Sequence, residues 1–589
     1  MTQIKPTARV LGFPNAEASQ AAFPAPAGQD THSSEDHVQP FPWQRRRIAP
    51  VFANRGMVAA SHPLVASTGL RILASGGNAV DAAVGAGLVA SVVMPEMCGL
   101  GGDLFALVHD PSQREAGETT ETSRPAVWSV QGSGIAPRGA TTEMMQRAHD
   151  GVHMPSTGPL AVTVPGMVYG YFTLLERWGS RSFADVAHPA IEYAYGHPIS
   201  PVLVSYIAKF ADLLARVPAT AAVFLPDGRP PEPGTIFRQE NLARTLEALA
   251  AGGVDVFYKG DVGERIAAYV SELGGALRLS DLADHETTVS PPLSTSYRGY
   301  TVYQTALPSQ GLIMLESLNI AEQFDLQDLG VGTPAATHVL VEATRLAFAD
   351  RHAYCQDPAF AESPVERLLS KDWAKSRAAL IGRAAGRDYL PGSLDEGHTT
   401  YLNVVDADGM MVSLIQSVAS NFGSGVVAGD TGVLLNNRAQ AFSLDPQHPN
   451  VFAPGKKPMH TLNCYLVADA AGRLVVVGGT PGGDRQPQWN LQVVVGLVDG
   501  GWDVQQAVEQ PLWFSSTPRG ADGATGLELT VESRVGEAFV DELRRRGHRV
   551  VVDSEWSALS GAQVIARDPV TGALAGGSDP RQEGLALGL

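Results

Sequence analysis

Two adjacent threonines, Thr399 and Thr400, open a strand-like run directly after the polar, turn-prone segment GRDYLPGSLDEGH. A threonine hydroxyl is a weak nucleophile unless a base lies beside it, and its own α-amino group can be that base. This group becomes free only when the peptide bond before the threonine is cut. Judged from this stretch alone, the pattern favours the simpler interpretation that Thr399 is a β-forming residue that opens an edge strand.

Other familiar catalytic patterns are absent from the sequence. A serine-hydrolase elbow requires GxSxG between a strand and a helix, and the nearest segment, FGSGV at residues 422–426, does not match it. No HExxH motif occurs, and Cys98, Cys355 and Cys464 form no CxxC pair. The 15 histidines are scattered along the chain. We therefore expect neither a metal site nor a cofactor.

A glycine-rich segment could stabilise negative charge. The strand-like run RLVVVGG leads into TPGGDRQPQ and then into the helical run WNLQVVVGLVDGG. The order strand, glycine loop, helix presents backbone N–H groups to an anion or an oxyanion. A plain connection without a ligand is the alternative. The loop is not a Walker motif, because no lysine follows the glycines.

The threonines need a hairpin that brings a second strand beside them. The runs TYLNVV and MMVSLIQS flank DADG, which is a turn signature. If the first and last residues of DADG close the turn, Thr399 lies opposite Gln416. If its last two residues form the turn, Thr400 lies opposite Ser417. Both registers predict that Thr399 is a neighbour of residues 416–418.

The rest of the chain mixes helices and strands. Residues 62–95 predict two helices that are separated at Gly76 and Gly77, with Asn78 capping the second helix. A strand is expected after the glycines of GLGGDLFALVHD and another in YRGYTVYQT, whereas THVLVEATRLAFADRHAY has the apolar spacing of a helix. No βαβ repeat is evident, and the chain becomes strand-rich after residue 390.

Composition is that of a folded globular protein. Of 589 residues 44% are hydrophobic and 18% charged, so the size of the core is not limiting. A net charge of −18 without a long basic run argues against nucleic-acid binding. No apolar run is long enough to span a membrane. Residues 1–50 lack a signal-peptide pattern and are expected to be a disordered extension, and the few cysteines fit a cytoplasmic protein.

Six segments resemble the γ-glutamyltransferase family and occur in the same order. They are SGGNAVDAAVGAGLVASVVMPEMCGLGGDLF, TTYLNVVDADGMMVSLIQSVASNFGSGVV, GVLLNNRAQAFSLDP, PGKKPMHTLN, GGTPGGDRQPQ and GGSDPRQEGLALGL. The resemblance implies an α+β fold, the four-layer αββα sandwich of N-terminal-nucleophile (Ntn) hydrolases. It also implies a precursor that cleaves itself between His398 and Thr399. The products would be a large subunit, residues 51–398, and a small subunit, residues 399–589, which form a heterodimer.

The same resemblance assigns the catalytic residues. Thr399 would be the nucleophile, and its freed α-amine would be the base during turnover. Ser417 matches the position of a supporting hydroxyl, in agreement with the hairpin pairing. Gly482 and Gly483 match the glycines whose N–H groups form the oxyanion hole of the family.

The substrate-binding positions depart from those of transferases that use glutathione-like donors. Ser133 stands where those enzymes hold the glutamyl α-carboxylate with an arginine, and Ala441 stands where an aspartate holds the α-amino group. His460 and Thr461 replace paired serines, and Arg438 replaces a neutral residue. Because a charged head group in a closed pocket needs charged partners, these losses argue against a γ-glutamyl substrate.

We therefore expect an amidohydrolase that acts on a small carboxylated amide, with oxamate as the best candidate. The pattern is similar to the branch that contains oxamate amidohydrolase, YwrD-like proteins and some glutaryl-cephalosporin acylases. Arg438, His460, Thr461 and Asn436 are the expected substrate-binding residues, although Arg438 could instead bond to the nearby SLDP turn. One alternative is a γ-glutamyl hydrolase or transferase that rebuilds head-group recognition with Arg438, Arg485 and His460. Another is an uncleaved binding protein.

Overall fold

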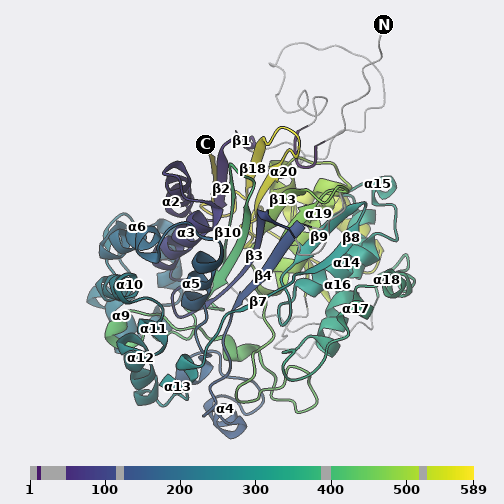
Figure 1. Ribbon diagram of the computed structural model, residues 1–589. Helices are drawn as coiled ribbons and strands as arrows, with labels where there is room; N and C mark the ends of the chain where they lie inside the picture. The colour runs from purple at the N-terminus through teal and green to yellow at the C-terminus, as the bar shows by residue number, and fades with distance from the viewer. Residues whose placement is uncertain (1–9, 15–47, 115–124, 387–398, 517–526) are drawn as a thin grey trace.

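The computed structural model describes residues 10–14, 48–114, 125–386, 399–516 and 527–589. Two seven-stranded sheets lie at its centre (Figure 1). The first sheet has the order β19 (Leu585–Gly588), β2 (Gly56–Ala60), β10 (Thr400–Asp406), β11 (Met411–Ser417), β3 (Asp103–Arg114), β4 (Pro125–Gly132), β7 (Thr288–Ser290). The second has the order β1 (Val51–Ala53), β18 (Leu574–Ser578), β17 (Gln563–Arg567), β13 (Leu474–Gly479), β12 (Cys464–Ala468), β9 (Tyr300–Gln304), β8 (Leu293–Tyr297).

Helices cover the outer face of each sheet, as Figure 1 shows. Those on the first sheet include α2 (Pro63–Ala74), α3 (Ala79–Val93), α5 (Met167–Trp178) and α6 (Phe183–Tyr195). Those on the second include α14 (Gly311–Ala321), α16 (Pro334–Tyr354), α19 (Gln486–Val498) and α20 (Val504–Glu509). A third apolar core, with Phe105, Tyr401 and Val477, fills the space between the sheets. The predicted four-layer α+β sandwich is confirmed.

The remaining α-helices and β-strands surround the sandwich. They are α4 (Thr142–Ala148), α7 (Pro201–Lys209), α8 (Ala211–Leu214), α9 (Pro218–Phe224), α10 (Glu240–Gly252), α11 (Asp255–Tyr258), α12 (Asp261–Glu272), α13 (Leu279–Ala283), α15 (Leu326–Leu329), α17 (Val365–Leu368), α18 (Lys371–Ala378), α21 (Glu537–Arg545), β5 (His197–Pro198), β6 (Ile236–Phe237), β14 (Trp513–Ser516), β15 (Glu528–Glu532) and β16 (Arg549–Asp553).

The two helices expected in residues 62–95 are present as α2 and α3. The side chain of Asn78 accepts hydrogen bonds from the backbone N–H groups of Val80 and Asp81, both at 3.0 Å. The Asp81 carboxylate in turn accepts from the Asn78 N–H at 2.9 Å. This reciprocal capping box satisfies N–H groups that the first helical turn would otherwise leave unpaired, and it confirms the predicted cap.

The β10–β11 hairpin has a register between the two that the turn signature suggested. Thr400 pairs with Gln416, so both predicted registers are wrong by one residue. The reason is a three-residue turn: the Asp406 carboxylate accepts from the N–H of Asp408 (3.1 Å) and Met410 (3.0 Å), and Gly409 has a φ of +87°. The predicted proximity of Thr399 to residues 416–418 is nevertheless confirmed.

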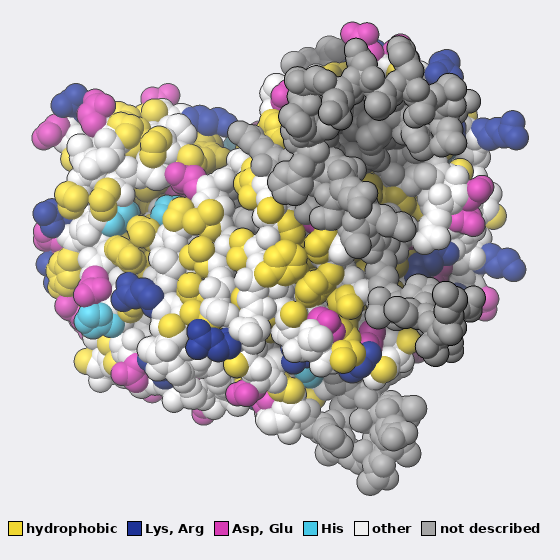
Figure 2. Space-filling view, turned by 90° about the horizontal axis from the view of Figure 1, so that it is seen from above, with side chains coloured by type: hydrophobic (Ala, Val, Ile, Leu, Met, Phe, Trp, Pro, Cys, Tyr) yellow, Lys and Arg dark blue, Asp and Glu magenta, His cyan; other side chains and the backbone are white. Residues whose placement is uncertain are grey.

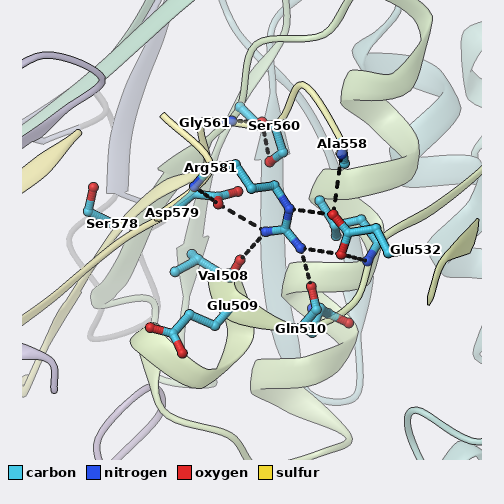
Figure 3. A network of polar contacts seen from close by, with 12 residues as sticks. Val508, Glu509, Gln510, Glu532, Ala558, Ser560, Gly561, Ser578, Asp579 and Arg581 are labelled. Carbon is cyan, nitrogen blue, oxygen red and sulfur yellow. Dashed lines mark hydrogen bonds and ion pairs between the residues drawn. The ribbon is translucent and has the colours of Figure 1, made fainter. Parts of the chain in front are cut away.

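A buried arginine ties the C-terminal segment to the body (Figure 3). Arg581 donates to both carboxylate oxygens of Glu532 at 2.7 Å and to Asp579 at 2.9 Å. It also donates to the backbone carbonyls of Val508 and Gln510. β19 follows Arg581 in the sequence and pairs with β2 as the edge strand of the first sheet. The network therefore fixes one edge of the sheet to which β10 and its threonine belong.

The N-terminal segment contacts the body through both of its described parts, and the N–H of Ile48 donates to Glu509 Oε1 at 3.0 Å. The predicted disordered extension, residues 1–50, lies outside the described residues except for residues 10–14 and 48–50. Within these, Leu11 is buried, and the Gly12 carbonyl accepts from the N–H of Val504 at 3.0 Å.

Figure 2 shows acidic and basic side chains interspersed over one face of the molecule. No helix in the described part of the chain has both the length and the apolar character needed to cross a membrane.

Candidate functional site

Three polar residues form a row across neighbouring strands at one end of the first sheet. Ser417 pairs with Asp103 of β3, and the hairpin register continued by one residue places Thr399 opposite Ser417. Residues that face each other on adjacent strands point to the same side. In this row that side is the space between the sheets, because Tyr401 and Ile415, two residues further along, belong to the core there. All three residues are buried.

The glycine loop of the second sheet meets this row. Gly482 has a φ of +128° and Gly483 a φ of +56°, and a Cβ on Gly482 would lie 2.5 Å from the buried ring of Trp489. Gln486 begins α19, and its Nε2 donates a long hydrogen bond of 3.5 Å to Thr399 Oγ1. The Thr399 hydroxyl therefore lies close to the N-terminus of a 13-residue helix, where the helix dipole favours negative charge.

A buried ion pair holds the glycine loop in place. Arg351 of α16 binds both oxygens of Asp484, at 2.5 and 3.0 Å. Gln310 Nε2 donates to the carbonyl of Gly483 at 2.8 Å, and its Oε1 accepts from Arg351 at 2.8 Å. Sequence reasoning missed this support, since Arg351 lies in a run that was recognised only for its apolar spacing.

A second charged group contains three of the expected substrate-binding residues. Arg438 Nε donates to Asp103 Oδ2 at 3.1 Å, and its Nη1 donates to Thr461 Oγ1 at 3.2 Å. His460 Nδ1 accepts from the N–H of Leu462 at 3.2 Å, so the ring proton is on Nε2, which donates to Asp103 Oδ2 at 3.1 Å. Burial is the main cause that lowers the pKa of His460 to about 4, and the charge of Arg438 is the second cause. The imidazole is therefore neutral near pH 7.

Asn436, the fourth expected residue, is engaged entirely with protein groups. Its Oδ1 accepts from the N–H and hydroxyl of Thr163 and from the N–H of Arg438, at 3.0–3.1 Å. Its Nδ2 donates to the carbonyls of Gly101 and Thr163, at 2.9 and 3.1 Å. These contacts fasten the segment before Arg438 to the start of β3, so Asn436 positions Arg438.

A cavity of about 590 Å³ opens beside this group. Arg438 and Thr461 line it, together with Asp484 and with Ala441, whereas His460 and Asn436 are not among its lining residues in the described part of the chain. Four histidines also line it, namely His149, His153, His352 and His448. Ser133 is buried. The cleavage position His398 lies outside the described residues.

One cluster in the described chain has metal-ligand side chains, namely His338, Glu342 and His548. His338 Nε2 donates to the Gly382 carbonyl at 2.9 Å, so its Nδ1 accepts from His548 Nε2 at 2.8 Å. Arg345 Nη1 donates to Glu342 Oε1 at 2.9 Å and lies 3.4 Å from His548 Nδ1. A cation bound by both rings would require Nδ1–H on His548, facing this guanidinium. The contacts favour a hydrogen-bonded chain over a metal site.

Comparisons with known proteins agree on one family. A family model described as Gamma-glutamyltranspeptidase matches residues 65–589. The Glutathione hydrolase-like YwrD proenzyme of Bacillus subtilis is 38% identical over 542 residues, covering 92% of this chain and 99% of that protein. The oxamate amidohydrolase proenzyme of Klebsiella pneumoniae is 36% identical over 546 residues, covering 91% and 99%. The crystal structure of cephalosporin acylase from Bacillus halodurans matches with a TM-score of 0.84 at 35% identity, covering 94% and 99%.

Proposed function

Because the chain belongs to the gamma-glutamyltranspeptidase family of Ntn-hydrolase enzymes, we propose that it cleaves itself between His398 and Thr399 and then hydrolyses a small carboxylated amide. The products of cleavage are a large subunit, residues 51–398, and a small subunit, residues 399–589. The names of the two relatives, both proenzymes, support self-processing and argue against an uncleaved binding protein.

The observation that carries this proposal is the position of the Thr399 hydroxyl. Thr399 is buried, and its hydroxyl is contacted by Gln486, which begins α19 three residues after Gly483. In the precursor, Oγ1 attacks the preceding carbonyl carbon, and the peptide C–N bond breaks as the acyl group moves from nitrogen to oxygen. Water then hydrolyses the ester and leaves Thr399 with a free α-amine.

In turnover, Thr399 Oγ1 attacks the substrate carbonyl, and the α-amine accepts the hydroxyl proton. With a reference pKa of about 8, this amine is suited to general-base catalysis near neutral pH. The N–H groups of Gly482 and Gly483 stabilise the oxyanion, and Ser417 supports the nucleophile. The amine gives its proton to the departing nitrogen, the C–N bond breaks, and water hydrolyses the acyl-enzyme.

Arg438 and Thr461 are the substrate-binding pair that we assign to the acyl carboxylate. Both line the cavity, and a guanidinium with a neighbouring hydroxyl suits a carboxylate. Ala441, which also lines the cavity, offers no partner to an α-amino group. A carboxylated acyl group without an amine, such as that of oxamate or a glutaryl amide, matches these residues best.

A second candidate is hydrolysis or transfer of γ-glutamyl groups. The cavity of about 590 Å³ is much larger than oxamate requires, and the Bacillus subtilis relative is named as glutathione hydrolase-like. Substrates that share the leaving group but differ in the acyl part separate the candidates.

The test uses the matured protein with oxamate, glutaryl 4-nitroanilide and γ-glutamyl 4-nitroanilide, and the Thr399→Ala variant as the inactive control. We expect ammonia from oxamate or nitroaniline from the glutaryl substrate, with the γ-glutamyl substrate slower than the glutaryl one. Efficient cleavage of the γ-glutamyl substrate alone would refute the first candidate and support the second.

A further inference from the structure

Asp103 is a buried carboxylate that the proposed mechanism does not use. It opens β3 immediately after two tightly packed glycines, where a Cβ on Gly101 would lie 2.3 Å from the Leu434 carbonyl oxygen and one on Gly102 would lie 2.3 Å from that of Ser417. The four residues that follow, Leu104 to Leu107, are all apolar and buried. A charge at this position therefore requires a partner inside the protein.

The partner with a full charge is Arg438. Asp103 Oδ2 accepts from both Arg438 Nε and His460 Nε2, each at 3.1 Å. Because the imidazole is neutral near pH 7, the guanidinium is the cation that is hydrogen-bonded to the carboxylate, and Lys457 also interacts with Asp103 electrostatically. Arg438 is only 3% exposed, and burying its guanidinium without a counter-charge would be costly.

The four residues of this charged group, Asp103, Arg438, His460 and Thr461, are placed differently with respect to the cavity. Arg438 and Thr461 line the cavity, whereas Asp103 and His460 are not among the lining residues in the described chain. Since Nε is bonded to Asp103, the opposite edge of the guanidinium, with Nη1 and Nη2, is the edge that can meet a ligand. The Nη1 contact to Thr461 Oγ1, at 3.2 Å, fixes the rotation of that edge.

We propose that Asp103 is a positioning residue for carboxylate recognition, which acts through its acceptor oxygen on Arg438 and does not touch the substrate. This inference rests on the proposed function, because it assigns Arg438 to the acyl carboxylate. Its specific content is that orientation of the guanidinium, through the Nε contact, sets the affinity for carboxylated acyl groups. Neutral acyl groups do not depend on it.

The test compares Asp103→Ala, which removes the acceptor, with Asp103→Asn, which keeps an acceptor oxygen but removes the charge. Asp110→Ala is the control, because Asp110 lies further along β3 and bonds only locally, to Ser112. The substrates are glutaryl 4-nitroanilide and pentanoyl 4-nitroanilide, which differ by the carboxylate. Self-cleavage and the melting temperature show whether each variant has folded.

For Asp103→Ala we expect KM for the glutaryl substrate to rise at least about tenfold with kcat nearly unchanged, since a hydrogen bond between charged groups is lost. The pentanoyl parameters should stay at the wild-type values. Asp103→Asn should keep KM for the glutaryl substrate within about threefold of wild type. Unchanged KM in Asp103→Ala, an equal loss on both substrates, or an equal loss in Asp103→Asn would overturn the inference.

Binding of glutarate, measured by calorimetry on the same variants, separates this inference from the proposed function. If wild type binds glutarate and Asp103→Ala binds it at least about tenfold more weakly, the positioning role stands even if no amide is hydrolysed. If wild type does not bind glutarate and does not distinguish the two anilides, the role of Asp103 is refuted together with carboxylate recognition by Arg438.

Discussion

Replacing Gly482 with alanine should damage catalysis far more than stability. The backbone at Gly482 has a φ of +128°, where a residue with a side chain is strained by on the order of 1–3 kcal/mol. The new Cβ would also lie 2.5 Å from Cζ3 of Trp489, roughly 1 Å inside an ordinary carbon–carbon contact. Trp489 is fully buried and cannot move into solvent, so the loop must shift and displace its N–H groups.

The expected result is a fall in kcat of about 10²- to 10³-fold, the usual effect of losing one oxyanion-hole donor. The assay is kcat for the preferred substrate, normalised to the amount of cleaved chain, together with the melting temperature. Gly274→Ala is the matched control, because Gly274 has a φ of +84° but a Cβ added there would meet no atom within 4 Å. It should lose on the order of 1–2 kcal/mol of stability and no activity. A Gly482→Ala enzyme with kcat within about threefold of wild type would refute the oxyanion assignment.

Two further predictions concern buried ionisable groups near the site. Arg351→Met leaves the Asp484 carboxylate buried without its cation, so urea denaturation should show a loss of about 3–5 kcal/mol; an unchanged midpoint would contradict the role of this pair. Because the pKa of His460 is lowered to about 4, the unfolded chain binds more protons than the native protein between about pH 6.5 and 4, and stability falls as the pH falls through that window. At about pH 4, the lower limit of this window, the effect of this one residue has lowered the free energy of unfolding by on the order of 3 kcal/mol. The melting temperature of His460→Gln should therefore drop less between pH 7 and pH 4.5 than that of wild type, and an equal drop would contradict the assignment.

Local signals in the sequence predicted the elements well but not their exact pairing. The capping box at Asn78 involves residues three positions apart, so it is visible in the sequence. The hairpin turn was also visible, yet its register depends on how the Asp406 side chain accepts two backbone N–H groups. One residue of difference in the turn moved the whole pairing by one position.

The candidate site required contacts between distant segments. Arg351 and Asp484 are separated by 133 positions, and Arg438 and Asp103 by 335. No local pattern in the sequence identifies the residue with which each of these side chains pairs. Asp103 did leave a signal, since a charged residue directly precedes the apolar run from Leu104 to Val108, but only the structure identifies Arg438 as its partner. The segment order of the family identified Thr399, and the hairpin predicted its proximity to residues 416–418, but the position of Asp103 beside Ser417 became apparent only from the strand registers.

Intact-mass analysis of the purified protein tests the central claim most directly. The full chain has a mass of 62.1 kDa. We predict that it converts to two fragments and that the smaller one begins at Thr399 and extends to Leu589, while Thr399→Ala remains a single chain without activity. A wild-type protein that is active but remains uncleaved, or a Thr399→Ala variant that still cleaves at this bond, would contradict the assignment of Thr399 as the nucleophile.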